Sequence, residues 1–123
     1  MLRYSAWMWY LLAVTYHITL VVLSIIPVSF LLSYVEATPI AGLESQDLLM
    51  HFTAYFILTI LWRKVILTNR GSVGIAIATG GVLEAAQYAI PWRSFSVLDF
   101  LTGAAGTAAA VGLAALLRRR AVS

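Results

Sequence analysis

Four stretches of almost unbroken apolar residues follow one another along the chain, with one long connection, Pro27–Gln46, and two short ones between them. The stretches are Ala6–Ile26, Leu48–Leu67, Gly74–Ile90 and Val97–Leu117. A helix needs about 20 apolar residues to cross the hydrocarbon core of a bilayer, so each stretch predicts a membrane-spanning helix. Pro27 and Pro91 follow the first and third stretches, and proline is poorly tolerated inside a helix. The pattern therefore predicts an all-α bundle of four transmembrane helices.

Lysine and arginine are distributed unevenly between the connections. Arg3, the basic residues of segment 63–70 and the run Arg118–Arg120 all fall on one side of a four-span chain. Arg93 is the basic residue of the other side. Because basic residues accumulate in cytoplasmic segments, both termini are predicted to be cytoplasmic, with the connection Pro27–Gln46 outside.

Composition agrees with one membrane domain covering residues 1–123. The chain is 62% hydrophobic and only 11% charged, which leaves too little polar surface for a soluble domain of this length. It has no cysteine, so disulfides and thiolate metal sites are excluded. The net charge of +3 comes from basic residues at segment ends rather than from a basic patch with interleaved aromatic residues. No nucleic-acid partner is therefore predicted.

A few polar and ionisable residues lie inside or beside the apolar stretches. An ionisable group in the middle of a bilayer costs about 2.5–3.5 kcal/mol even on lenient insertion scales, so it indicates a function. The predicted orientation brings all of these residues into the outer half of the bilayer. We expect them to form a ligand-binding site made of Asp47, His51, Tyr55, Glu84, Gln87, Arg93 and Asp99.

Several of these residues also have a structural explanation. Asp99 follows Ser96 by three positions, which matches a helix-capping pattern, and Asp47 is similarly placed. Arg93 could simply extend towards the lipid headgroups. Glu84 has no such explanation, because it lies in the C-terminal half of its helix, where the helix dipole disfavours an anion. Glu84 is therefore the first candidate for a functional residue.

The remaining notable residues have packing explanations. His17 lies in the middle of the first span, and we expect it to be a hydrogen-bonded packing residue. A metal site from His17, His51 and Glu84 lacks local ligand spacing, so neither a metal nor another cofactor is predicted. A stripe of small residues on the fourth span indicates close helix packing, within the chain or against another membrane protein. The stripe consists of Gly103, Gly106 and Ala110.

The order and spacing of the polar residues resemble the VanZ-like family, named after a small membrane protein associated with glycopeptide (teicoplanin) resistance. The resemblance runs from Asp47 to Ala110, with a further piece at Leu23–Pro27. The family often has a lysine where Leu48 stands and an asparagine where Gly103 stands. The resemblance implies a multi-pass protein of the bacterial inner (cytoplasmic) membrane. The matching pieces are Asp47-x-x-x-His51-Phe52-x-x-Tyr55, Glu84-x-x-Gln87, Pro91-x-Arg93-x-x-Ser96-x-x-Asp99 and Gly106.

Three functions are open at this point. The preferred one is a non-enzymatic envelope protein that binds an amphipathic lipid or lipoglycopeptide, with Arg93 contacting its anion and Asp99 holding Arg93. The second is a membrane-embedded enzyme with His51 as general base, oriented by Asp47 or Glu84. No nucleophile motif supports an enzyme, and no catalytic residue is predicted. The third is an accessory subunit that docks through the small-residue stripe. A proton pathway is a weaker idea, because one His–Glu layer does not make a relay.

Overall fold

The computed structural model of the chain describes residues 2–26, 43–91 and 97–122, with side chains described in 6–26, 48–91 and 97–121. The described residues form four α-helices and no strand. The helices are α1 (Leu2–Ile25), α3 (Leu43–Ile66), α4 (Asn69–Ala89) and α5 (Val97–Val122). The predicted all-α class is therefore confirmed.

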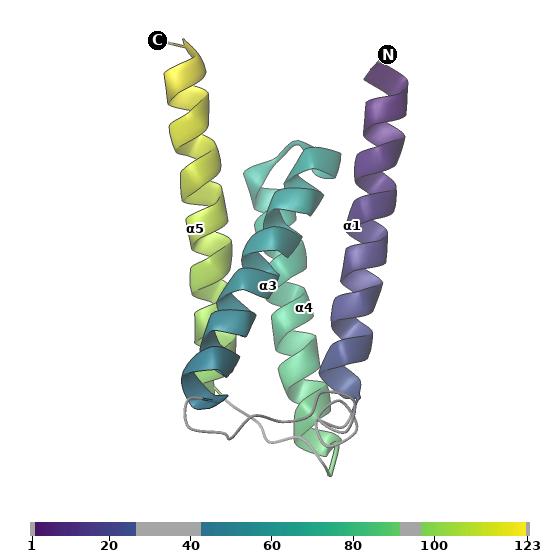
Figure 1. Ribbon diagram of the computed structural model, residues 1–123, viewed down its shortest axis with the longest axis vertical. Coiled ribbons are helices and arrows are strands. Elements are labelled where there is room, and N and C mark those ends of the chain that lie inside the picture. Colours follow the sequence, from purple (N-terminus) through teal and green to yellow (C-terminus); the bar gives the residue numbers. More distant parts are fainter. Residues whose placement is uncertain (1, 27–42, 92–96, 123) are drawn as a thin grey trace.

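The helices alternate in direction, so the N-terminus and the C-terminus lie at the same end of the molecule (Figure 1). α1 and α5 stand on opposite sides of the pair α3 and α4, and they do not contact each other in the described part of the chain. α3 and α4 each contact all three other helices, and the contacts of α3 with α1 and α5 are more extensive than those of α4. α3 is thus the central helix of the fold.

α3 and α5 approach closely because α5 carries glycine where the two backbones meet. A Cβ atom built on Gly106 would overlap the backbone oxygen of Phe52 and lie 3.0 Å from its carbonyl carbon. One residue further along α5, Thr107 hydrogen bonds to Thr59 across the same interface, with 3.1 Å between the hydroxyl oxygens. Both threonines are buried. Small residues and hydroxyl groups hold membrane helices together in this way.

The turn between α3 and α4 is only two residues long. Leu67 ends α3 in the left-handed region, with φ of 65°, and its N–H donates to the carbonyl of Arg63 at 2.9 Å. Thr68 begins α4 by accepting a hydrogen bond from the N–H of Gly71 at 3.2 Å. Arg63 also donates from Nε to Oδ1 of Asn69 at 2.6 Å. The turn therefore fixes α3 and α4 as antiparallel neighbours.

Three helices are long and apolar enough to cross a membrane: Ala6–Ile25 of α1, Leu48–Ile66 of α3 and Val97–Ala121 of α5. In α1 only 6% of the most apolar window is buried inside the chain, and large apolar side chains such as Trp7, Leu11 and Ile18 are more than half exposed. Such large apolar surfaces are not left in water by soluble monomers. The chain is therefore a multi-pass membrane protein.

The predicted third span, Gly74–Ile90, has a different outcome. The residues form a helix, α4, but α4 is not among the helices that are long and apolar enough to qualify as spans. The physical reason is that α4 carries polar side chains on its buried face, among them Ser72, Glu84 and Gln87. A crossing by α4 is therefore not established by its composition.

Candidate functional site

Three ionisable side chains meet near the end of the bundle at which α1 and α4 end and α3 and α5 begin. His51 comes from α3, Glu84 from α4 and Asp99 from the first turn of α5. Glu84 precedes the end of α4 by about 7 Å, at 1.5 Å per residue. The three helices thus converge on one site, and the predicted meeting of these three residues is confirmed.

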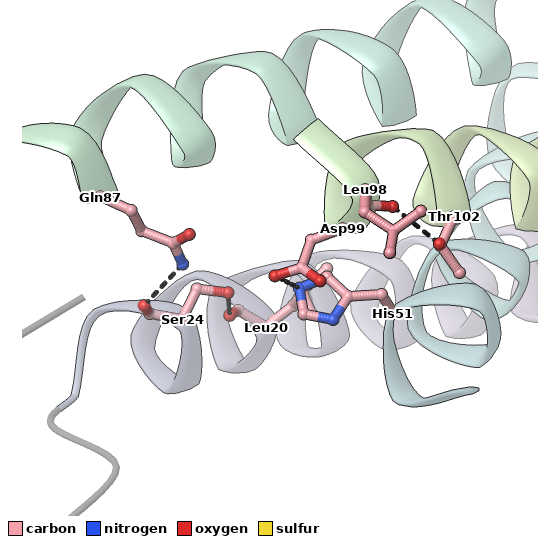
Figure 2. A network of polar contacts seen from close by, with 7 residues as sticks. All are labelled: Leu20, Ser24, His51, Gln87, Leu98, Asp99 and Thr102. Atoms are coloured by element: carbon pink, nitrogen blue, oxygen red, sulfur yellow. Dashed lines mark hydrogen bonds and ion pairs between the residues drawn. The ribbon is translucent and has the colours of Figure 1, made fainter. Parts of the chain in front are cut away.

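The geometry of this His51–Glu84–Asp99 cluster is tight. One nitrogen or oxygen atom from each side chain lies within 4.8 Å of the corresponding atoms of the other two. The Nε2 atom of His51 and the Oδ2 atom of Asp99 are 3.8 Å apart, which is longer than a hydrogen bond (Figure 2). Glu84 is buried, with 7% of its surface exposed, whereas the His51 and Asp99 side chains are 25% and 17% exposed. The cluster therefore has a buried floor and an accessible edge.

The cluster lines a small cavity between α3, α4 and α5. The centre of a water-sized sphere can occupy about 10 Å³ of it, which is the space of roughly one water molecule. Tyr55, Phe100 and Thr107 line it together with the cluster. No lysine or arginine belongs to this lining in the described part of the chain. The cavity can thus hold a water molecule or an ion, but not an acyl chain.

Tyr55 fixes the shape of the cavity. Tyr55 is buried, with 8% of its surface exposed, and its ring faces two glycines, Gly80 on α4 and Gly103 on α5. A Cβ atom on Gly103 would lie 2.8 Å from Cδ2 of Tyr55, and one on Gly80 would lie 3.6 Å from its Cε1. An asparagine at position 103 would not fit beside this ring unless the ring or α5 moved. The absence of a side chain at Gly103 therefore leaves the space that the Tyr55 ring occupies.

Gln87, also predicted as a site residue, is turned towards α1. Its Nε2 atom donates to the carbonyl oxygen of Ser24 at 3.1 Å, and the hydroxyl of Ser24 donates to the carbonyl of Leu20 at 2.7 Å (Figure 2). Gln87 shares the buried face of α4 with Glu84 but makes this contact with another helix. It therefore attaches the end of α1 beside the site.

His17 forms a separate polar contact among α1, α3 and α4. The indole Nε1–H of Trp62 donates to Nδ1 of His17 at 3.1 Å, and Nε2 of His17 lies 3.0 Å from the hydroxyl of Thr79. An indole only donates, so Nδ1 must accept and a neutral ring carries its proton on Nε2. The hydroxyl of Thr79 in turn donates to the carbonyl of Ile75 at 2.6 Å. The expected hydrogen-bonded packing role of His17 is confirmed.

Two predicted site residues cannot be placed. Arg93 lies outside the described residues, as do Ser96 and the connection 27–42. Asp47 belongs to α3, but its side chain is outside the described part. Their roles in ligand binding stay predictions.

The small-residue stripe of α5 is used inside the chain. All three of its residues are buried. Close helix packing, one of the two interpretations of the stripe, is thus confirmed. A contact of Gly103, Gly106 and Ala110 with another membrane protein stays a prediction, and it would require α5 to move away from α3.

Sequence reasoning missed the partners of His17, namely Trp62 and Thr79, and the lining residue Thr107. Only Thr107 had a detectable signal, because it lies one turn beyond Gly103 on the small-residue stripe.

Chemically, the site offers one imidazole and two carboxyl groups. These groups can bind a cation, hold an ammonium group or exchange protons with a ligand.

Comparisons with protein-family models, curated proteins and solved structures found no match to this chain.

Proposed function

We propose that the chain is a four-span protein that binds the headgroup of an amphiphile at the His51–Glu84–Asp99 cluster. One observation carries this proposal: three ionisable side chains from three helices converge in a chain that is otherwise 62% hydrophobic. Placing ionisable groups in a membrane is costly, so such a convergence indicates a function. The resemblance of the motif residues to the VanZ-like family supports the same class of function.

The small size of the cavity limits how the amphiphile can bind. Because it has room for about one water molecule, the headgroup contacts the exposed edges of His51 and Asp99, and the acyl chain stays outside in the bilayer. Two carboxyl groups favour the ammonium of a zwitterionic headgroup. Arg93, six residues before Asp99 in the sequence, supplies the contact for a phosphate or carboxylate, which its guanidinium binds bidentately.

The proposal includes α4 as a fourth span. α4 has 21 residues and so extends about 31 Å, enough for the hydrocarbon core. It packs against both α3 and α5, which do qualify as spans. Its buried polar side chains Glu84 and Gln87 lie inside the bundle, whereas Val82, 67% exposed, presents an apolar surface outwards. With four crossings, the basic residues at both termini lie in the cytoplasm.

Reporter fusions test this topology. A reporter attached after Ser123 and one inserted at Thr68, in the α3–α4 turn, are both expected to be active only in the cytoplasm. If α4 did not cross, α5 would carry the C-terminus to the opposite side from the turn. Activity of the Ser123 fusion in the external compartment alone, with the Thr68 fusion cytoplasmic, would contradict a fourth span.

Amphiphile binding is tested on the purified protein. Lipids that copurify with the wild type are expected to be enriched in a zwitterionic or anionic class relative to the bulk membrane, as measured by mass spectrometry of the extract. Asp99→Asn and His51→Ala should abolish the enrichment, because they change the exposed edge of the site. Tyr88→Ala is the control, because Tyr88 is 79% exposed on α4. Equal lipid profiles for all four proteins would contradict the proposal.

Glycopeptide resistance, which the resemblance to the VanZ-like family implies, is tested separately. Susceptibility to lipoglycopeptides is compared between cells that lack the protein and cells with wild type, Arg93→Ala or Glu84→Ala at matched membrane levels. Protection by the wild type alone is expected. Identical susceptibility in all four strains would remove the resistance role.

A second candidate is an enzyme that acts on a lipid headgroup. The observation in its favour is that the partly exposed imidazole of His51 lies beside the carboxylate of Asp99, which can orient it as a general base. Turnover of a headgroup ester by purified protein, lost in His51→Ala, would distinguish this function from simple binding.

A further inference from the structure

We infer that His51, Glu84 and Asp99 together form a binding site for one divalent transition-metal ion, with Zn²⁺ the best fit. Imidazole nitrogen and carboxylate oxygen are common Zn²⁺ ligands, at about 2.0–2.2 Å from the ion. Three such ligands in tetrahedral geometry lie roughly 3.4 Å from one another. The 3.8 Å between His51 and Asp99, and the 4.8 Å limit for all three atoms, leave only small side-chain rotations to complete the site.

The charges at the site favour a divalent cation. Two carboxylates and a neutral imidazole carry two negative charges, and none of the described lining residues is lysine or arginine. Charges held in a medium of low dielectric are costly unless they are paired or bound to a metal. Glu84 is the most buried of the three. One divalent ion neutralises the cluster with all three ligands deprotonated.

The size and opening of the cavity agree with an ion that keeps one ligand position free. The space of about 10 Å³ suits a single ion or water molecule. Three protein ligands leave the fourth tetrahedral position for water or for an oxygen of a bound molecule, as in accessible zinc sites. The partly exposed edges of His51 and Asp99 border this position. A phosphate or carboxylate oxygen could therefore reach the ion from outside the bundle.

The choice of metal follows from the ligand types. Ca²⁺ takes six to eight oxygen ligands, and Mg²⁺ prefers oxygen and retains several waters, so an imidazole with two carboxylates suits neither. Ions that prefer thiolate have no ligand here, because the chain has no cysteine. A borderline ion such as Zn²⁺ remains. The inference needs no bound amphiphile, so it can fail or succeed independently of the proposed function.

Metal content of the full chain is the direct test. Untagged protein in detergent is stripped with a chelator, equilibrated with Zn²⁺, freed of excess metal and measured by elemental mass spectrometry. We expect one Zn²⁺ per wild-type chain and at least tenfold weaker binding by His51→Ala, Glu84→Gln and Asp99→Asn. His17→Gln is the matched control, because the chain has two histidines and His17 belongs to the separate contact with Trp62 and Thr79.

Chromatography and thermal unfolding test the zinc site even if one of the variants folds poorly. Each variant is compared by size-exclusion chromatography, and Asp99→Asn, an isosteric change at a partly exposed side chain, is used if Glu84→Gln aggregates. Zn²⁺ should raise the thermal midpoint of wild type and His17→Gln but not of the three site variants. Failure of the wild type to bind Zn²⁺, equal binding by folded Asp99→Asn, or loss of binding in His17→Gln would overturn the inference.

Discussion

Gly106→Ala is expected to separate α5 from α3 and to lower the stability of the protein by about 3 kcal/mol, the upper end of the usual cost of overpacking. The reason is that the added Cβ atom overlaps the backbone oxygen of Phe52. A side chain could rotate away, but a carbonyl group of a helix can move only with its helix. Thermal unfolding in detergent, followed by the loss of the monodisperse chromatographic peak, measures the effect.

The same helix provides the control. A Cβ atom built on Gly112 has nothing within 4 Å, so Gly112→Ala should leave the midpoint unchanged or raise it slightly. Alanine is favoured over glycine in a helix by up to about 1 kcal/mol. Equal midpoints for Gly106→Ala and Gly112→Ala would show that α3 and α5 do not approach at Phe52. Because His51 adjoins Phe52, Gly106→Ala should also weaken Zn²⁺ binding.

The helices were largely predictable from the sequence, because long apolar runs and prolines carry strong local signals. The ends of the helices were less predictable. α3 starts at Leu43, before the apolar run that begins at Leu48, and α5 continues through Arg118–Arg120 to Val122. Hydropathy marks the part of a helix that suits the bilayer, whereas polar turns extend the same hydrogen-bonded ladder into the interface. Basic residues in the last turn also suit the negative end of the helix dipole.

The core of the site was predictable for a different reason. Glu84 has no structural explanation within its own helix, so a partner on another helix was required, and its partners His51 and Asp99 are at matching depth. Gln87 was placed in the site from its spacing to Glu84, but its amide contacts Ser24 of α1. Spacing along a helix assigns a face, whereas the rotation and register of the neighbouring helix decide the contact.

A metal ligand set was not predictable by local spacing. Sequence spacing detects ligands that share one helix or loop, but here each ligand comes from a different helix. One of the two histidines considered for such a site, His17, is hydrogen bonded to Trp62 and Thr79 instead. Only the assembled bundle brings Asp99 beside His51 and Glu84.

The second large effect is expected from Tyr55→Ala, which removes the ring that fills the space between α3, α4 and α5. Truncating a buried aromatic residue costs about 3–5 kcal/mol, and we expect the lower value because lipid rather than water surrounds the bundle. Tyr88→Ala makes the same chemical change at a side chain that is 79% exposed, so its effect should be within about 0.5 kcal/mol. Thermal midpoints in detergent compare the two, and similar losses would contradict the position of Tyr55.

Combining Tyr55→Ala with Gly103→Ala isolates the energetic effect of the contact between position 103 and the Tyr55 ring. Alone, Gly103→Ala forces its Cβ atom to within 2.8 Å of the Tyr55 ring, so the ring or α5 must move and stability falls. In the Tyr55→Ala background the ring is absent, so the same methyl group enters free space and costs much less. The double variant should therefore be more stable than the sum of the single effects predicts. Additivity within about 0.5 kcal/mol is the behaviour of distant sites, and it would mean that Gly103 does not accommodate Tyr55.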